Sequence, residues 1–144
     1  MSPRPGHAPP LGRVLETALY VADLERSRSF YETVLGLEVM VSDERLVALD
    51  AGGATVLLLF RQGASLEGAG DEDGAIPDHD GRGRVHFAFA IDADTLDAWR
   101  EYLGAQGVAI ESEREWPRGA TSLYFRDPDG HLVELATPGI WPTY

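Results

Sequence analysis

The sequence predicts an α+β protein in which two βαβββ modules pair into an open, half-barrel-like curved mixed sheet with helices outside. Stretches with strand-like alternation and stretches with helical spacing follow one another in the same order twice. The helix ends also match, since VLGLEV in the first half corresponds to YLGAQGVAI in the second. A repeat this short buries its hydrophobic face only by pairing sheets, so we expect both modules to curl around a shared concave surface.

Residues 14–61 are expected to form the first module. VLETALYVA is typical of a strand, and Asp23 is placed to cap the helix LERSRSFYETVLG, which Gly36 ends. The segments LEVMVS, RLVALD and ATVLLLF then read as three short strands. Before them, residues 1–13 are rich in proline and are expected to be a disordered arm.

Residues 62–84 are rich in Gly and Asp and predict a long, acidic, mobile loop. Residues 85–137 repeat the first pattern as a second module: the strand VHFAFAID, a helix TLDAWREYLGAQG capped by Asp92 or Asp94, and the strands VAIESE, TSLYFR and HLVELA. An Asp-Pro-Asp-Gly turn joins the last two strands as a hairpin. Residues 138–144 form a C-terminal tail, so the chain has one domain over residues 14–137.

The composition excludes several classes of function. A formal charge of -12 argues against nucleic-acid binding, because phosphates would be repelled. All 12 basic residues other than histidine are Arg, so Schiff-base chemistry on lysine is excluded, and the absence of Cys excludes disulfides and thiolate sites. No segment has the length and apolarity of a membrane span, so we expect a cytoplasmic protein with a small-molecule ligand.

Alternation along the strands places Glu16, His86 and Glu134 on the face away from the helices, with Ser122, Tyr124 and Arg126 nearby. If the two sheets face each other, these groups converge. Two carboxylates and an imidazole in one cavity are stable together when a divalent cation holds them, so Glu134 is interpreted as a metal ligand. Two alternatives stay open: a strand glutamate on an exposed face, or an ion pair of Glu134 with Arg84 or Arg126.

Three segments resemble the vicinal oxygen chelate superfamily, which includes glyoxalases, fosfomycin resistance transferases, bleomycin resistance proteins and extradiol dioxygenases. They are LYVADLERSRSFYETVLGLEV, GRVHFAFAI and the closing hairpin SLYFRDPDGHLVELATP. The resemblance covers about residues 14–137 and implies the glyoxalase-like fold. It also implies a divalent metal with open positions at which substrate chelates through adjacent oxygens.

The resemblance places Glu16, His86 and Glu134 at the family's metal-ligand positions, and Tyr124 at a substrate-contacting tyrosine of the fosfomycin branch. Leu57 stands where glyoxalases carry a fourth ligand, which argues against glyoxalase I isomerisation. A Glu, His, Glu set favours Mn, Ni, Zn or Mg, with Fe as the remaining candidate, and argues against dioxygenase chemistry, which uses two His and one carboxylate.

Further candidates come from the loops. Trp116 and Arg118 precede the strand TSLYFR and are expected to bind an aromatic or carboxylate-bearing substrate, together with Ser122, Tyr124 and Arg126; Trp116 as a simple packing residue is equally compatible. His79 on the acidic loop, Tyr124 and Glu134 are the candidates for acid–base catalysis. Trp141 could cover the cavity or a subunit contact.

Two functions follow. The first is a metal-dependent lyase, isomerase or transferase that activates a small, vicinally oxygenated substrate. The alternative is a metal-free protein that sequesters a drug, as the bleomycin resistance proteins do, which the net acidity would suit. A homodimer is expected, and the sequence leaves open whether the modules pair within one chain or exchange between chains.

Overall fold

The computed structural model describes residues 6–144, so the first five residues of the expected arm lie outside the described part. Module one consists of β1 (Glu16–Val21), α1 (Leu24–Ser29), the π-helical turn η1 (Phe30–Val34), β2 (Glu38–Ser42), β3 (Leu46–Asp50) and β4 (Val56–Arg61). Its sheet has the order β1-β4-β3-β2, in which β1 and β4 are parallel and the other pairs are antiparallel.

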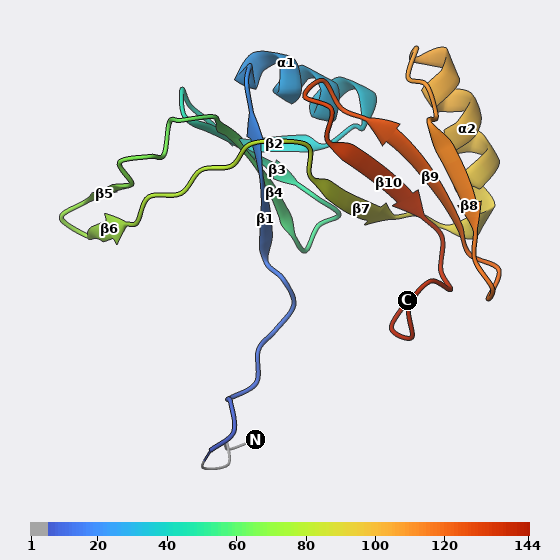
Figure 1. The fold of residues 1–144 in the computed structure, drawn as a ribbon, viewed down its shortest axis with the longest axis horizontal. Coiled ribbons are helices and arrows are strands. Elements are labelled where there is room, and N and C mark those ends of the chain that lie inside the picture. Colours follow the sequence, from blue (N-terminus) through green and yellow to red (C-terminus); the bar gives the residue numbers. More distant parts are fainter. Residues whose placement is uncertain (1–5) are drawn as a thin grey trace.

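Module two repeats this arrangement. It consists of β7 (His86–Ala90), the short turn η2 (Ala93–Thr95), α2 (Leu96–Ala105), β8 (Ser112–Glu115), β9 (Thr121–Arg126) and β10 (Leu132–Ala136). The sheet order is β7-β10-β9-β8, with β7 and β10 parallel. The predicted α+β class with two βαβββ modules is therefore confirmed, and the two sheets form no closed barrel (Figure 1).

The first helix changes its winding midway, which the sequence did not predict. Asp23 caps it as expected, accepting from the Arg26 amide at 3.1 Å. From Phe30 onward the helix is π-wound, and the Leu35 amide donates to the Phe30 carbonyl at 3.3 Å. Phe30 and Leu35 pack against the cores of both modules. The π-helical turn therefore lies where side chains of one helix contact two hydrophobic cores.

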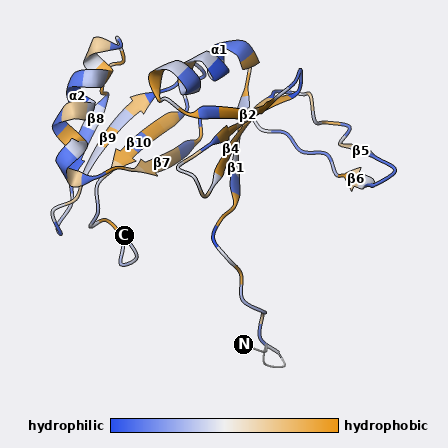
Figure 2. Cartoon of the chain, turned by 180° about the vertical axis from the view of Figure 1, so that it is seen from behind, coloured by the Kyte–Doolittle hydropathy of each residue, from blue (hydrophilic) through white to orange (hydrophobic). Residues whose placement is uncertain are grey.

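Each module has its own hydrophobic core between its sheet and its helix. In module one the fully buried residues include Leu19, Leu49 and Leu59, and in module two they include Leu123, Phe125 and Leu135. Figure 2 shows that β4, β7 and β10 are largely apolar, while the outer surfaces of α1 and α2 are mixed. Phe87 and Phe89 on β7 contact both cores and join them.

The turn between β9 and β10 fastens the two modules together. The buried Asp127 accepts a hydrogen bond from the Tyr31 hydroxyl on η1 at 2.6 Å, and burial together with this carboxylate raises the pKa of Tyr31. Asp129 accepts from the Ala22 amide at 2.8 Å and from the Ser27 hydroxyl at 3.1 Å. These bonds tie the closing hairpin of module two to the first helix of module one.

His131, in the same turn, completes this connection. Its Nδ1 accepts from the Val85 amide at 3.0 Å, so its Nε2 carries the proton and donates to the Tyr20 carbonyl, also at 3.0 Å. The ring is 2% exposed. One neutral imidazole thus bridges β1 and the segment before β7 by satisfying one backbone group of each.

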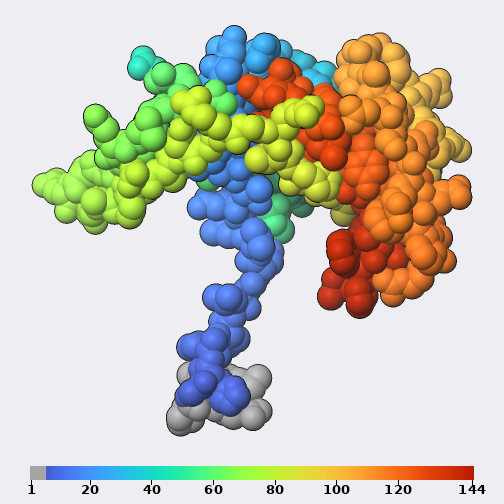
Figure 3. Space-filling model, viewed as in Figure 1, coloured from blue at the N-terminus to red at the C-terminus, as the bar shows by residue number. Residues whose placement is uncertain are grey.

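The segment 62–84 is not the unstructured loop that the sequence predicted. It contains a small antiparallel hairpin of β5 (Ala69–Asp71) and β6 (Gly74–Ile76), which projects away from both sheets (Figures 1 and 3). Glycine is required at position 70, where φ is 137° and the backbone of Gly74 leaves no room for a Cβ atom. Within residues 6–144 no helix is long and apolar enough to cross a membrane.

Candidate metal centre

The strand faces sort as expected in module two. On β9 and β10, Leu123, Phe125, Val133 and Leu135 point into the core, and the register pairs Glu134 with Tyr124 on β9 and with Ala88 on β7. The face away from α2 therefore carries the polar side chains. Because His86 begins β7 two residues before Ala88, its ring lies diagonally beside Glu134 on that face.

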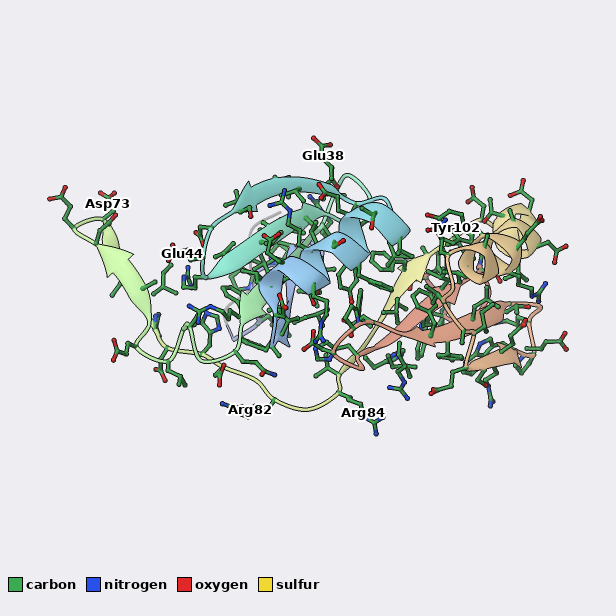
Figure 4. The ribbon with its side chains drawn as sticks, turned by 90° about the horizontal axis from the view of Figure 1, so that it is seen from above. Glu38, Glu44, Asp73, Arg82, Arg84 and Tyr102 are labelled. Carbon is green, nitrogen blue, oxygen red and sulfur yellow. The ribbon has the colours of Figure 1, made fainter. Side chains whose placement is uncertain are left out.

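Glu134 is 7% exposed, and its partners answer why a carboxylate sits in an otherwise apolar strand. Its Oε1 lies 3.1 Å from His86 Nε2, and its Oε2 accepts a hydrogen bond from the Ser122 hydroxyl. Neither proposed arginine pairs with it. Arg126 instead forms an ion pair with Glu111 at 3.0 Å, and Arg84 points outward from the connection before β7 (Figure 4).

The tautomer of His86 decides what can lie between His86 Nε2 and Glu134 Oε1. Its Nδ1 lies 3.0 Å from the Leu132 carbonyl oxygen, which can only accept, so Nδ1 carries a proton. In the neutral ring, Nε2 then presents a lone pair to the carboxylate oxygen of Glu134. Two lone pairs facing each other are stable only with a cation between them or a second proton on the ring. One nitrogen and one carboxylate oxygen oriented in this way suit a divalent metal ion.

Three further side chains support this pair. The Trp116 indole donates to the Ser122 hydroxyl at 3.0 Å, and Ser122 in turn donates to Glu134, so both hold the carboxylate in place. Tyr124 lies beside His86, with ring centroids 6.2 Å apart. Burial is the main cause that raises the pKa of Tyr124, and the nearby charge of Glu134 adds to it, so the hydroxyl remains a donor at neutral pH.

Besides Arg126, two predicted site residues lie away from the cavity at Glu134. Arg118 donates from Nε and Nη2 to the carbonyls of Gly139 and Ile140, both at 3.1 Å, so it holds the C-terminal tail. His79, in the segment 62–84, packs against module one: its Nδ1 is 2.7 Å from the Tyr20 hydroxyl and its ring centroid is 4.6 Å from that of Phe60. Neither side chain lines the cavity at Glu134.

Glu16 is exposed at the first position of β1, on the same face as Ala18 and Tyr20. Among residues 6–144 of one chain, no three His, Asp or Glu side chains come together as a metal site, so Glu16 does not join His86 and Glu134 within the chain. The single chain thus brings together two of the three predicted ligands.

The register corrects the position of the missing fourth ligand. His86 aligns with Leu132 on β10, and Glu134 lies two residues beyond. In module one Glu16 aligns with Val56, so the corresponding position is Leu58 and not Leu57. Leu57 is 2% exposed and belongs to the core. The expectation of three ligands rather than four is unchanged.

A cavity of about 470 Å³ opens directly beside Glu134 and His86. Its lining is mainly aromatic and apolar, and part of it comes from the C-terminal tail. The lining residues are His86, Ala88, Phe89, Ala90, Trp116, Tyr124, Glu134, Ala136, Ile140, Trp141 and Tyr144.

Sequence reasoning missed several residues that position this site, namely Asp127, Asp129, His131 and Tyr144. The sequence signal for Asp127, Asp129 and His131 is that these polar residues come directly before the strand Leu132–Ala136, whereas Tyr144 has no such signal. Tyr144 donates to the carbonyls of Ile91 and Ala136 at 3.0 and 2.9 Å, which holds the tail beside the cavity.

Comparison with known proteins agrees with this fold. Residues 13–135 match the family model described as Glyoxalase/Bleomycin resistance protein/Dioxygenase superfamily. The metallothiol transferase FosB of Bacillus licheniformis is 31% identical over 122 residues, which cover 84% of this chain and 72% of that protein.

Solved structures show the same relationship. The crystal structure of lactoylglutathione lyase from Agrobacterium tumefaciens is 34% identical with a TM-score of 0.84, covering 93% of this chain and 99% of that one. FosX from Listeria monocytogenes shares the fold at 24% identity and a TM-score of 0.66, covering 90% and 96% of the two chains. These relatives support an enzyme of the same superfamily. The chain belongs to the glyoxalase/bleomycin resistance protein/dioxygenase superfamily.

Proposed function

We propose that the protein is a metal-dependent enzyme that activates a small, vicinally oxygenated substrate chelated to a divalent metal ion. His86 and Glu134 of one subunit would hold the ion together with Glu16 of the partner subunit in a homodimer. Transfer of a thiol is the reaction to assay first, because the FosB relatives at 29–32% identity are named metallothiol transferases.

The observation that carries this proposal is the pair of His86 Nε2 and Glu134 Oε1, 3.1 Å apart, with the Nδ1 proton committed to the Leu132 carbonyl. A buried carboxylate that served only the fold would need donors on both oxygens, and its second donor here would require a second proton on His86. Here Ser122 supplies a donor to one oxygen, while the other faces an imidazole nitrogen beside an open cavity. That arrangement leaves room for a cation.

The homodimer follows from the third ligand. Glu16 occupies in module one the register position that His86 occupies in module two, and it is exposed on the face away from α1. Its position in the single chain, apart from the other two ligands, supports completion of the site by a second copy. Such an exchange gives two equivalent sites related by a two-fold axis.

The chain's own residues then have separate tasks. Ser122 and Trp116 fix the orientation of Glu134, and the protonated Tyr124 can donate to a substrate oxygen. A bound divalent ion would supply Lewis-acid polarisation of the chelated oxygens. Because the chain has no Cys, an attacking thiol must come from a second substrate.

His79 remains our candidate for proton transfer from the module-one side. Its ring lies against Tyr20 and Phe60, and Tyr20 shares the β1 face with Glu16. In an exchanged dimer this face would lie opposite the partner's cavity. Burial raises the pKa of Tyr20, with Asp80 adding to the effect, so its hydroxyl keeps its proton at neutral pH, 2.7 Å from His79 Nδ1.

Metal content tests the proposal. Protein purified without an affinity tag is expected to carry about one divalent ion per chain by elemental analysis, and Glu134→Ala is expected to lose it. Glu111→Ala, which removes an exposed carboxylate on the same module, is the matched control and should retain the ion. A wild-type protein that neither carries metal nor gains thermal stability with Mn, Ni, Zn, Mg or Fe would exclude the metal-dependent enzyme.

The register predicts where a fourth ligand can be added. Leu58→Glu is expected to slow the loss of metal to a chelator at least several-fold, because the new carboxylate would enter the same site as Glu16. Leu57→Glu is the control, since it buries a charge in the core and should lower the melting temperature without retaining metal. Equal chelator sensitivity of Leu58→Glu and wild type would contradict the assignment of this face.

One observation favours a metal-free sequestering protein as the second candidate. The β5–β6 hairpin exposes Asp71, Glu72 and Asp73, and Asp73 lies at the outer end of this hairpin (Figure 4). With a formal charge of -12, such a surface suits a cationic drug. Binding of a cationic glycopeptide to protein that carries no metal would favour this candidate.

A further inference from the structure

We propose that residues 137–144, called here the tail wall, select the substrate, and that the part of the substrate lying against this wall is an uncharged, planar aromatic group. The inference rests on the proposed function, because the tail wall borders the cavity that contains His86 and Glu134. It goes further by naming the chemistry of the group that the cavity accepts beside the metal ligands.

The cavity is divided between a polar part and an aromatic part. His86 and Glu134 are the candidate metal ligands in its lining, whereas Trp116, Trp141, Tyr144 and Ile140 provide aromatic and aliphatic surface. Its volume of about 470 Å³ lies within the range of small-molecule sites. A ligand that chelates at the polar part can therefore place its remainder against these rings.

The tail wall is held in one position before any ligand arrives. Arg118 donates to the Gly139 and Ile140 carbonyls, and the Tyr144 hydroxyl donates to the Ile91 and Ala136 carbonyls. The segment also closes on itself, since the Gly139 amide donates to Tyr144 at 2.9 Å. Figure 3 shows the tail wall packed against the segment that leads into β9.

Glycine at position 139 allows this close packing. Its φ is 118°, and an added Cβ atom would lie 3.1 Å from the Arg118 carbonyl oxygen. A wall fixed by side-chain bonds at both ends and by a close backbone contact loses little entropy when a ligand binds, which favours selective recognition.

Trp141 is the feature that points to an aromatic ligand. In the single chain Trp141 is 66% exposed, although hydrogen bonds of Arg118 and Tyr144 hold the backbone on both sides of it. A rigid, exposed indole at the mouth of a cavity offers a stacking surface, since aromatic groups favour offset or edge contacts with one another.

The charge of the cavity lining indicates that the aromatic group of the ligand is uncharged. Neither Arg nor Lys lines the cavity; Arg114 stacks over the Trp116 ring at 4.3 Å, and Arg118 is committed to the tail carbonyls. An anionic group lying against the tail wall would be desolvated without a counter-ion. An uncharged aromatic group meets no such cost.

Nuclear magnetic resonance of the tryptophan side chains tests the inference. The chain has three tryptophans, and Trp99 on α2 lies outside the cavity, so its indole N–H signal is an internal control. The probes are naphthalene-2-methanol, its saturated analogue decahydronaphthalene-2-methanol, and naphthalene-2-carboxylate, each added to full-length protein treated with a chelator. We expect the naphthyl alcohol to shift the Trp116 and Trp141 signals, and the other two probes to bind at least several-fold more weakly.

Trp141→Ala is expected to weaken binding of the naphthyl alcohol about 2- to 10-fold, whereas Tyr102→Phe should leave it unchanged, because the Tyr102 hydroxyl donates to the Val34 carbonyl and the residue does not line this cavity. Equal binding of the aromatic and saturated alcohols, stronger binding of the carboxylate, or an unchanged affinity of Trp141→Ala would overturn the inference. Because the titration uses metal-free protein, its result is independent of metal content. The experiment therefore distinguishes a wrong inference about the tail wall from a wrong proposal of the metal site.

Discussion

Replacing Asp127 by alanine is expected to lower the free energy of unfolding by about 3 kcal/mol or more, because it removes the acceptor for three donors. These donors are the Tyr31 hydroxyl at 2.6 Å and the backbone amides of Asp129 and His131, both at 2.9 Å. Tyr31 is fully buried, so its hydroxyl would find no water to replace the carboxylate. Urea denaturation followed by circular dichroism measures the change.

Two other variants separate the network from a general effect of charge. Tyr31→Phe removes one donor and leaves both amides satisfied, so its expected loss is smaller, about 1–2 kcal/mol. Asp97→Ala removes an exposed carboxylate that pairs with Arg100 and should cost less than about 1 kcal/mol. A loss for Asp127→Ala no larger than that for Asp97→Ala would show that this turn does not fasten the modules.

The repeated pattern of the sequence predicted the fold well because each module depends on local periodicity. Bulky and small residues alternate on HFAFA, and on LVELA two aliphatic residues alternate with the face that carries Glu134. This predicted which face of β7 and β10 lies in the core and placed His86 and Glu134 together. Successive side chains of a strand point to opposite faces of the sheet. Once one residue of the strand is known to be buried, the face of every other residue is therefore known.

The same rule explains the error at Leu57. A shift of one residue in the register of β4 exchanges the two faces, and the sequence alone gave no register for ATVLLLF, in which both faces are apolar. Only the pairing of Glu16 with Val56 shows that Leu58 shares the face of the metal ligands.

Contacts between modules could not be predicted for a different reason. Tyr31 and Asp127 are separated by 96 residues, and His131 and Tyr20 by 111, so no local pattern links them. Likewise, Arg118 was expected at the cavity, but the tail carbonyls that it binds lie 21 and 22 residues further along the chain. Loop side chains follow such tertiary partners rather than their neighbours in sequence.

The largest effect on metal binding is expected from removing one ligand in each of two variants and then mixing the two variant chains. Glu16→Ala and Glu134→Ala should each abolish metal binding when purified alone, since each removes one ligand from every site. If the modules exchange, a mixed dimer of the two variants has one site with all three ligands and one site with only His86. Mixing the two inactive proteins should therefore restore part of the metal binding.

This mixing experiment tests the central claim most directly. The two variants are combined in equal amounts, dissociated in mild denaturant, reassociated with the divalent ion and analysed for bound metal, with wild type treated in parallel. Exchange predicts recovery of about a quarter of the wild-type metal content, because half of the dimers are mixed and half of their sites are intact. No recovery in the mixture, while wild type regains its full content, would contradict a site shared between subunits.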